Sequence, residues 1–293
     1  MIRYEYDFAK TKAEIDAIDP KWFQKATKRS SGFVKAGKFG EKTSIWSTVK
    51  PAFMRLQMNK CVFCERQFEN PEYGTIEFDL EHFRPKSSVV EWPHAVVHSK
   101  LSYAFPTGAP SATGYYWLSY DISNYAASCK VCNTTFKSNY FPVSNARGMA
   151  PGDDLSAEGA HLCYPIGSSD EDPENLISFL ATTAVPANGS PYHRQRGQVI
   201  IDFFGLNQRE QLHRERARMI SLFGSALESQ NRGTATTDDL LLIERIMSPA
   251  LPHASCLRAF KNSWTTDPDL ARRTYELCRR YTVSDQGTAP PTV

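Results

Sequence analysis

The sequence predicts an α+β protein that is mainly helical and is built around a small central unit held by four cysteines. Cysteine pairs at Cys61/Cys64 and Cys129/Cys132 bracket segments of strand-like composition. Helical periodicity is strong on both sides of this unit. The expected organisation is a helical lead-in at 1–60, the central unit at 61–142, a mainly helical region at 143–283 and a disordered tail at 284–293.

The two cysteine pairs have the spacing of a zinc site. Cys61 and Cys64 form one Cys-x-x-Cys turn, and Cys129 and Cys132 form a second. Two such turns supply four thiolates, which complete a tetrahedral sulfur cage for Zn²⁺. A redox-active Cys-x-x-Cys uses a single pair in a βαβ context, which this pattern does not match. We therefore expect structural zinc with all four coordination positions closed, and chemistry elsewhere.

A strand that carries chemical groups is predicted between the two cysteine pairs. From Ile76 to His82 apolar residues alternate with acidic ones, which is typical of a half-buried strand. At its end, Glu81 is a hard oxygen ligand and His82 titrates near neutral pH. Asn133, directly after the second cysteine pair, offers a neutral oxygen ligand. These groups suit metal-assisted hydrolysis.

Composition predicts the rest of the central unit. The aromatic run Tyr116–Tyr120 has high β propensity and is expected to form the second strand. A helix is expected after the second cysteine pair, ending before Pro142 and placing Asn133 and Lys137 one turn apart on the same side. Residues 87–114 are too long for a hairpin turn, so an insertion between the strands is expected.

Together these residues resemble the HNH, or ββα-metal, nuclease family. That family has an acidic residue followed by His on the first strand, an Asn after the second strand, and a last metal ligand at the start of the helix. The matching positions are Glu81, His82, Asn124 and Asn133, with cysteines as in the zinc-containing subgroup. Two departures are Glu81, where the family usually has Asp, and Asn133, where it usually has His.

The resemblance is more specific than the core pattern. It extends to the HNH proteins of bacterial anti-phage systems, including the Septu and retron-associated nucleases. The residues that carry it are Glu81-His82-Phe83-Arg84-Pro85-Lys86, Asn124-Tyr125, Ser128-Cys129, Cys132-Asn133, Lys137 and Phe141-Pro142. It covers roughly residues 45 to 220 and is weak beyond about 225.

The resemblance implies a metal-dependent endonuclease. Glu81 and Asn133 would hold a divalent cation, Mg²⁺ or another, at the scissile phosphate, and neutral His82 would take a proton from the attacking water. Asn124 would fix the loop or the orientation of the imidazole. Phosphate contacts are expected from Arg84, Lys86 and Lys137.

The same residues also have plainer interpretations. A His beside a Glu is usually a surface ion pair, and an Asn after a Cys can simply cap a helix. Asn124 can be a turn residue, and Arg84 and Lys137 can be solvated surface charges. The presence of all the elements in the right order favours the catalytic interpretation of His82.

The segments outside the central unit give helical and basic signals. Thr11 and Glu14 form a capping-box pair for a short helix that is expected to stop near Pro20. From Lys25 to Lys42 six basic residues are opposed only by Glu41. This stretch is the best local candidate for binding phosphate, and the alternative is a solvated loop.

In the C-terminal region, capping patterns predict where helices begin. The residues that indicate these starts are Asn207 with Glu210, Thr237, and Asp267 with Pro268. The remaining cysteines, Cys163, Cys256 and Cys278, are scattered and are expected to be reduced, mostly buried thiols.

Composition bounds the partners and the compartment. The formal net charge is +2, which excludes the strongly basic character of many DNA-coating proteins, so nucleic-acid contacts must come from local patches. No apolar run has transmembrane length and no cleavable signal pattern is found, so a cytoplasmic protein without a membrane partner is expected.

The leading hypothesis is a metal-dependent HNH endonuclease of a bacterial anti-phage system, acting on DNA. A separate ATPase partner is inferred from the family alone. One alternative keeps the site and changes the substrate to structured RNA such as tRNA, because the scissile phosphate is shared. The other is a catalytically silent zinc module that only docks nucleic acid or protein.

Overall fold

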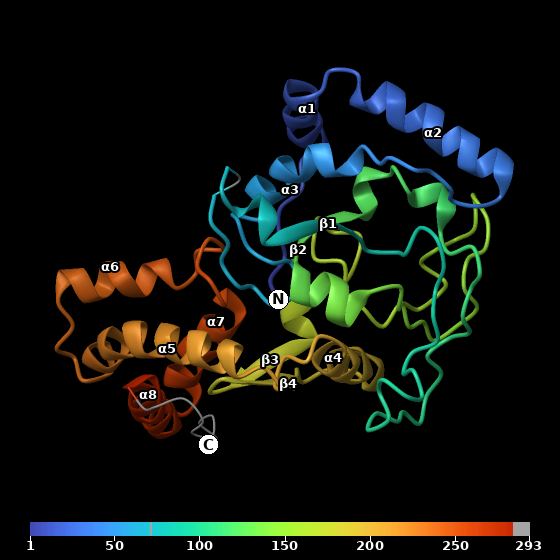
Figure 1. The fold of residues 1–293 in the computed structure, drawn as a ribbon. Helices are drawn as coiled ribbons and strands as arrows, with labels where there is room; N and C mark the ends of the chain where they lie inside the picture. The colour runs from blue at the N-terminus through green and yellow to red at the C-terminus, as the bar shows by residue number, and fades with distance from the viewer. Residues whose placement is uncertain (71, 284–293) are drawn as a thin grey trace. The chain divides into compact units, whose positions relative to one another are not determined.

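The computed structural model describes residues 1–70 and 72–283, and the predicted disordered tail lies outside them. The chain forms two compact units. The site unit comprises Tyr4–Val62 and Phe68–Asp170, and the C-terminal unit comprises Met1–Arg3, Phe63–Gln67 and Glu171–Val293. Helices predominate, with two-stranded antiparallel sheets (Figure 1). This mixed composition agrees with the predicted α+β class.

The site unit begins with helices α1 (Phe8–Ile18), α2 (Trp22–Ala36) and α3 (Lys50–Leu56). The prediction that α1 ends before Pro20 is confirmed, but Thr11 is not its cap. Asp7 caps it instead, accepting from Lys10 N at 3.0 Å, while the Thr11 hydroxyl donates to the Asp7 carbonyl. The basic stretch, for which a solvated loop is the alternative, begins as helix α2 and continues past Gly37.

Strands β1 (Phe78–His82) and β2 (Tyr125–Cys129) pair antiparallel, with Glu81 opposite Ala126 and His82 opposite Tyr125. Figure 1 shows the two strands side by side near α3. The strand that ends at His82 is confirmed, but it does not include Ile76. That residue ends a 3-10 helix, and its side chain is 76% exposed.

The position predicted for the second strand is wrong. Tyr116–Leu118 forms a 3-10 helix, and the strand that pairs with β1 starts after Asn124. All five residues of β2 are buried and two of them are alanines, so the strand shows neither alternation nor high β propensity. The aromatic run has high β propensity, yet its rings pack against neighbouring aromatic side chains instead.

A π-helix, Val131–Lys137, follows β2 and includes Cys132. It ends before Pro142, as predicted. Residues 87–114 contain only isolated bridges, Val89 with Ser111 and Val90 with Tyr140, which agrees with an insertion between the strands.

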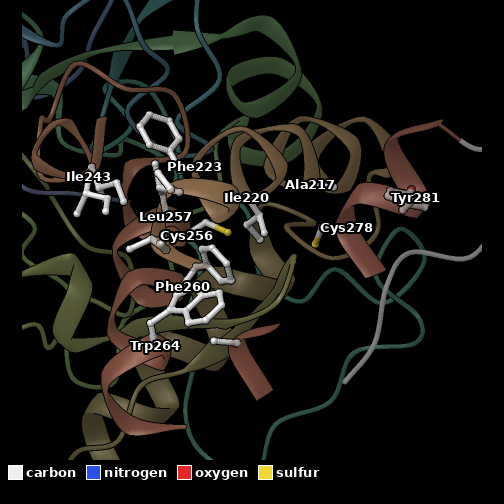
Figure 2. Packing of buried hydrophobic residues seen from close by; sticks show 14 residues of the cluster. Ala217, Ile220, Phe223, Ile243, Cys256, Leu257, Phe260, Trp264, Cys278 and Tyr281 are labelled. Carbon is white, nitrogen blue, oxygen red and sulfur yellow. The ribbon is translucent and has the colours of Figure 1, made fainter. Parts of the chain in front are cut away.

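In the part of the C-terminal unit that the structure describes, a hairpin is combined with five α-helices. The sequence does not predict its strands β3 and β4, because each has only four residues. The elements are β3 (Ile177–Leu180), β4 (Thr183–Pro186), α4 (Pro191–Phe203), α5 (Glu210–Asn231), α6 (Thr237–Arg245), α7 (Ala254–Thr266) and α8 (Pro268–Val283). Figure 2 shows its core, where Phe223, Leu257 and Phe260 pack together with Cys256 and Cys278.

Caps at these helices partly match the sequence patterns. Asp267 accepts from Leu270 N at 2.9 Å, as its place before Pro268 predicts. The capping box of α6 belongs to Thr236, one residue before the predicted Thr237, and α5 follows Arg209, which makes no side-chain cap bond. Across the described ranges, no helix is both long and apolar enough to cross a membrane.

Candidate functional site

The four cysteines of the Cys-x-x-Cys turns meet at one point. Their Sγ atoms all lie within 4.8 Å of one another, and all four residues are buried. Zinc–sulfur bonds of about 2.3 Å in a tetrahedron place sulfurs about 3.8 Å apart, so this group fits a zinc ion. Cys129 N donates to Cys61 Sγ and Cys132 N donates to Cys129 Sγ, both at 3.3 Å. Such bonds favour the thiolate form that binds metal.

Next to this cluster, three of the predicted catalytic residues line one cavity of about 290 Å³, which we call the site cavity. Strand β1 supplies Glu81 and His82 from its end, and the π-helix supplies Asn133 from its first turn. The predicted convergence of strand and helix on a common cavity is therefore present. Lys86 also lines the site cavity, whereas Asn124, Arg84 and Lys137 do not.

His82 is buried and held on several sides. Its Nε2 lies 3.0 Å from the Ser119 carbonyl oxygen, and the rings of Trp46 and Tyr125 pack edge-on at 4.9 and 5.0 Å. A carbonyl only accepts, so Nε2 carries the proton and Nδ1 carries the lone pair. Burial, with repulsion from Lys86, lowers the pKa of His82 well below its usual value. The imidazole is therefore neutral at neutral pH.

Glu81 is paired inside the protein. Its Oε1 lies 3.4 Å from Lys137 Nζ, and the Lys137 side chain is 0% exposed. Burial raises the pKa of Glu81 to about 7 and lowers the pKa of Lys137 to about 8, and the attraction between them opposes both shifts. The interpretation of Lys137 as a solvated surface charge is therefore wrong.

Asn133 is oriented by a carboxylate that sequence reasoning did not single out. Its Nδ2 donates to Asp79 Oδ2 at 3.2 Å, which leaves the amide oxygen for another partner. Asp79 Oδ1 lies 3.3 Å from Lys50 Nζ, and both residues line the site cavity. Asp79 lies two residues before Glu81 on the strand, so the period of two would have placed both on one face.

Asn124 secures the backbone just after His82. Its Oδ1 accepts from Arg84 N at 2.7 Å, and its Nδ2 donates to the Arg84 carbonyl at 3.0 Å. This pair of hydrogen bonds to the backbone of one residue matches the loop-fixing role that the resemblance implies. The residue also ends the 3-10 helix Ile122–Asn124, so it occupies a turn as the alternative states, but its side chain is buried.

Arg84 points away from the site cavity. Its Nε bonds to Glu158 Oε2 at 3.1 Å and its Nη2 to the Leu155 carbonyl at 3.2 Å. Glu158 also accepts from Tyr115 and from Gly148 N, at 2.6 and 2.8 Å. The expectation that Arg84 contacts phosphate disagrees with this placement, because an internal ion pair leaves the guanidinium few free donors.

Lys86 is the predicted phosphate contact that does reach the site cavity. Its Nζ lies 4.5 Å from the centre of the Trp46 ring and 5.5 Å from that of Phe39. Burial lowers its pKa. The aromatic rings stabilise the ammonium group without neutralising it.

Comparison with known proteins finds a relative among Septu proteins. The chain is similar to Septu protein PtuB of Bacillus mycoides (strain KBAB4), with 30% identity over 209 residues. The alignment covers 70% of this chain and 61% of the relative, so the chain spans less than two thirds of that protein's length. No family model matches the chain, and no solved structure matches it.

Proposed function

We propose that the chain is a metal-dependent nuclease of a Septu-type bacterial anti-phage system, with the HNH arrangement of a strand pair and a short helix. The observation that carries the proposal is the meeting of Glu81, His82 and Asn133 around one cavity. Similarity to a Septu protein supports the defence context. The buried cysteine cluster beside the same helix supports the zinc-containing form of the arrangement.

His82 acts as the general base in this proposal. The Ser119 carbonyl holds the proton on Nε2, so Nδ1 is the nitrogen that accepts a proton from water. Burial keeps the ring neutral, and Trp46 and Tyr125 fix its orientation. A base with a fixed tautomer needs no rearrangement before it takes the proton.

Glu81 and Asn133 are the proposed ligands of a divalent cation. Hard oxygen donors from a carboxylate and an amide suit Mg²⁺ or a similar ion, and Asp79 adds a second carboxylate to the same cavity. When bound, the cation would stabilise charge on the scissile phosphate and leaving oxygen. The Asp79 bond to Nδ2 of Asn133 leaves the amide oxygen available as a ligand.

The phosphate contacts are reassigned from the predicted set. Lys86 is retained, and Lys50 is added because it lines the site cavity beside Asp79. Arg84 is a positioning residue that holds the segment after β1 through Glu158. Lys137 is an internal partner of Glu81.

The test compares the parent protein with His82→Ala on DNA and on structured RNA, with Mg²⁺, Mn²⁺ or Ni²⁺ added. Loss of the base is expected to lower cleavage by at least about a hundredfold while zinc content and circular dichroism stay unchanged. His161→Ala is the matched control, because His161 is also buried and its Nε2 also bonds to a backbone carbonyl, Pro106 O at 2.9 Å. His161 does not line the site cavity.

Two results would count against the proposal. Cleavage that persists in His82→Ala at the parent rate would exclude His82 as the base. Absence of cleavage of either polymer with every metal, in a zinc-loaded folded protein, would favour the non-catalytic docking module. The DNA and RNA arms separate the two substrate hypotheses.

An ATPase partner belongs to the same proposal. The similarity to a Septu protein supports a defence-system setting, and within that setting we propose that a separate ATPase gates the nuclease. Co-purification with the product of a neighbouring ATPase gene is the expected result. Full, unregulated activity of the isolated chain would argue against such gating.

A further inference from the structure

Positive charge is concentrated in one short part of the site unit. Residues 21–43 contain seven Lys or Arg and a single acidic residue, Glu41, which gives a net charge of +6. The whole chain has a net charge of +2, so the other residues sum to −4. This segment is therefore where a polyanion would be attracted most strongly.

The fold arranges these charges along a groove. A cavity of about 680 Å³ lies between one face of α2 and the segment that follows it. Lys25, Lys28 and Arg29 line it from the helix, and Lys38 lines it from the opposite side. The three lysines are exposed. A basic groove open to solvent suits a chain of phosphates better than an isolated small anion.

Some of these cations are paired and others are not. Lys25 pairs with Asp19 and Arg29 with Glu41, each at 2.7 Å. Within residues 1–70 and 72–283, no ion pair is present at Lys28 or Lys38. These two lysines are therefore the members of the groove with uncompensated charge.

The side of the groove that α2 forms has open space at Gly32. A Cβ added to Gly32 would meet no atom within 4 Å, and Gly32 has an ordinary helical conformation. Gly32 lies about one turn beyond Lys28, which places it on the same face. A backbone can therefore approach α2 closely beside Lys28.

The groove is joined to the site cavity by aromatic rings. Phe33 lines the groove, and its ring centre lies 5.0 Å from that of Phe39. Phe39 is 6.0 Å from Trp46, which lines the site cavity and lies 4.9 Å from His82. The Phe33 ring thus lies within about 16 Å of the His82 ring, the length of roughly five base pairs.

We propose that this groove binds the phosphate backbone of the nucleic-acid substrate a few nucleotides from the scissile bond, with Lys28 and Lys38 as its main phosphate contacts. The inference rests on the proposed function and deepens it by giving the substrate a path into the site cavity. The spacing between α2 and the segment that follows it is held by the ion pair of Glu41 with Arg29 and by the rings of Phe33, Phe39 and Trp46.

The test measures binding separately from cleavage. Fluorescence anisotropy with labelled DNA and RNA duplexes of the same sequence is recorded for His82→Ala, without added divalent cation, across a salt series. Adding Lys28→Ala and Lys38→Ala removes two phosphate contacts, so the slope of log affinity against log salt should fall by about 1.8 for duplex DNA. Between about 50 and 200 mM salt, the groove variant should therefore lose about tenfold less affinity than the protein that carries His82→Ala alone.

A matched control accompanies the double variant, and a second groove variant has a control of its own. Lys10→Ala with Arg279→Ala removes two exposed charges elsewhere and should leave the slope unchanged. Gly32→Glu should weaken binding by placing a carboxylate in the groove, whereas Gly32→Ala should not. The RNA arm shows which polymer the groove prefers.

The proposal is overturned if His82→Ala binds neither duplex, or if the groove variant changes the slope no more than the control pair does. Cleavage by the protein with His82 intact is read on the same duplexes with metal added. A slope change without any cleavage would support the groove and reject the nuclease proposal. Cleavage together with an unchanged slope would support the nuclease proposal and reject the groove.

Discussion

At the scale of single residues, the site cavity depends on an ion pair that is removed from water. Glu81 and Lys137 lie 3.4 Å apart, and their side chains are 8% and 0% exposed. A buried pair contributes little net stability, because desolvation offsets the attraction, but a lone buried charge is costly. A substitution of Glu81 is therefore expected to lower stability by leaving Lys137 unpaired, whether or not Glu81 also binds a metal ion.

Glu81→Gln is expected to destabilise the protein by about 3 kcal/mol at neutral pH, because it leaves the Lys137 ammonium buried without its partner. Glu81→Gln combined with Lys137→Met should recover most of that loss, since no charge remains. Urea unfolding measures both variants. Cleavage should be lost in both, which separates stability from the proposed ligand role. Equal stability of the two variants would mean that the pair is not coupled.

Asn124→Ala is expected to slow cleavage about ten- to a hundredfold, because it removes both hydrogen bonds to the Arg84 backbone and so loosens the segment beside His82. Zinc content and duplex affinity should stay as in the parent. Single-turnover cleavage rates provide the measurement. Asn139→Ala is the comparison, because it removes a side-chain bond to Ser88 at a residue that, unlike Asn124, lines the site cavity. A parent-like rate in Asn124→Ala would contradict the positioning role.

The sequence predicts the residues of the site cavity better than their surroundings. Glu81, His82 and Asn133 converge as expected, because a strand end and a following helix carry them in a recognisable order. Lys50 escapes prediction, since its approach to Asp79 depends on how α3 packs against β1. The inward pairing of Arg84 escapes it too, because its partner, Glu158, lies 74 residues away in the chain.

At the scale of elements, prediction is limited by burial and by length. Apolar and acidic residues alternate along β1, so the sequence reveals this strand. Strand β2 is buried throughout, and a short strand that is fully buried has no hydrophobic period to detect. The hairpin of β3 and β4 is too short to stand out. Long helices such as α5 and α8 are expected, because apolar faces are local features, and for α8 the Asp267 cap is local too.

Two helical glycines have opposite expected responses to alanine. Gly197→Ala in α4 should destabilise the protein by about 1–3 kcal/mol, because the added Cβ would overlap the Leu176 carbonyl oxygen. Gly32→Ala in α2 should stabilise it by up to about 1 kcal/mol, because the site is open and alanine favours helix. Thermal unfolding of the pair tests close packing of α4 on the hairpin. Stabilisation by Gly197→Ala would reject it.

At the scale of the whole molecule, the cysteine cluster links segments that are far apart in sequence. Cys61 and Cys129 are 68 positions apart, and Asn133 follows Cys132 directly. A metal held by these sulfurs would fix the start of the π-helix relative to the segment after α3. In the proposed mechanism, the position of Asn133 as a ligand therefore depends on a structural metal that takes no part in the reaction.

Removal of zinc from the cysteine cluster should unfold the segments around the site cavity. Because a structural zinc site with four cysteine ligands contributes on the order of 10 kcal/mol, Cys132→Ser or a strong chelator should lower Tm by at least about 10 °C and abolish cleavage. Zinc analysis and circular dichroism measure the change. Cys163→Ser is the matched control, since Cys163 is equally buried but outside the cluster, and it should keep its zinc. A Cys132→Ser protein with full zinc and the parent Tm would show that the cluster does not hold the fold together.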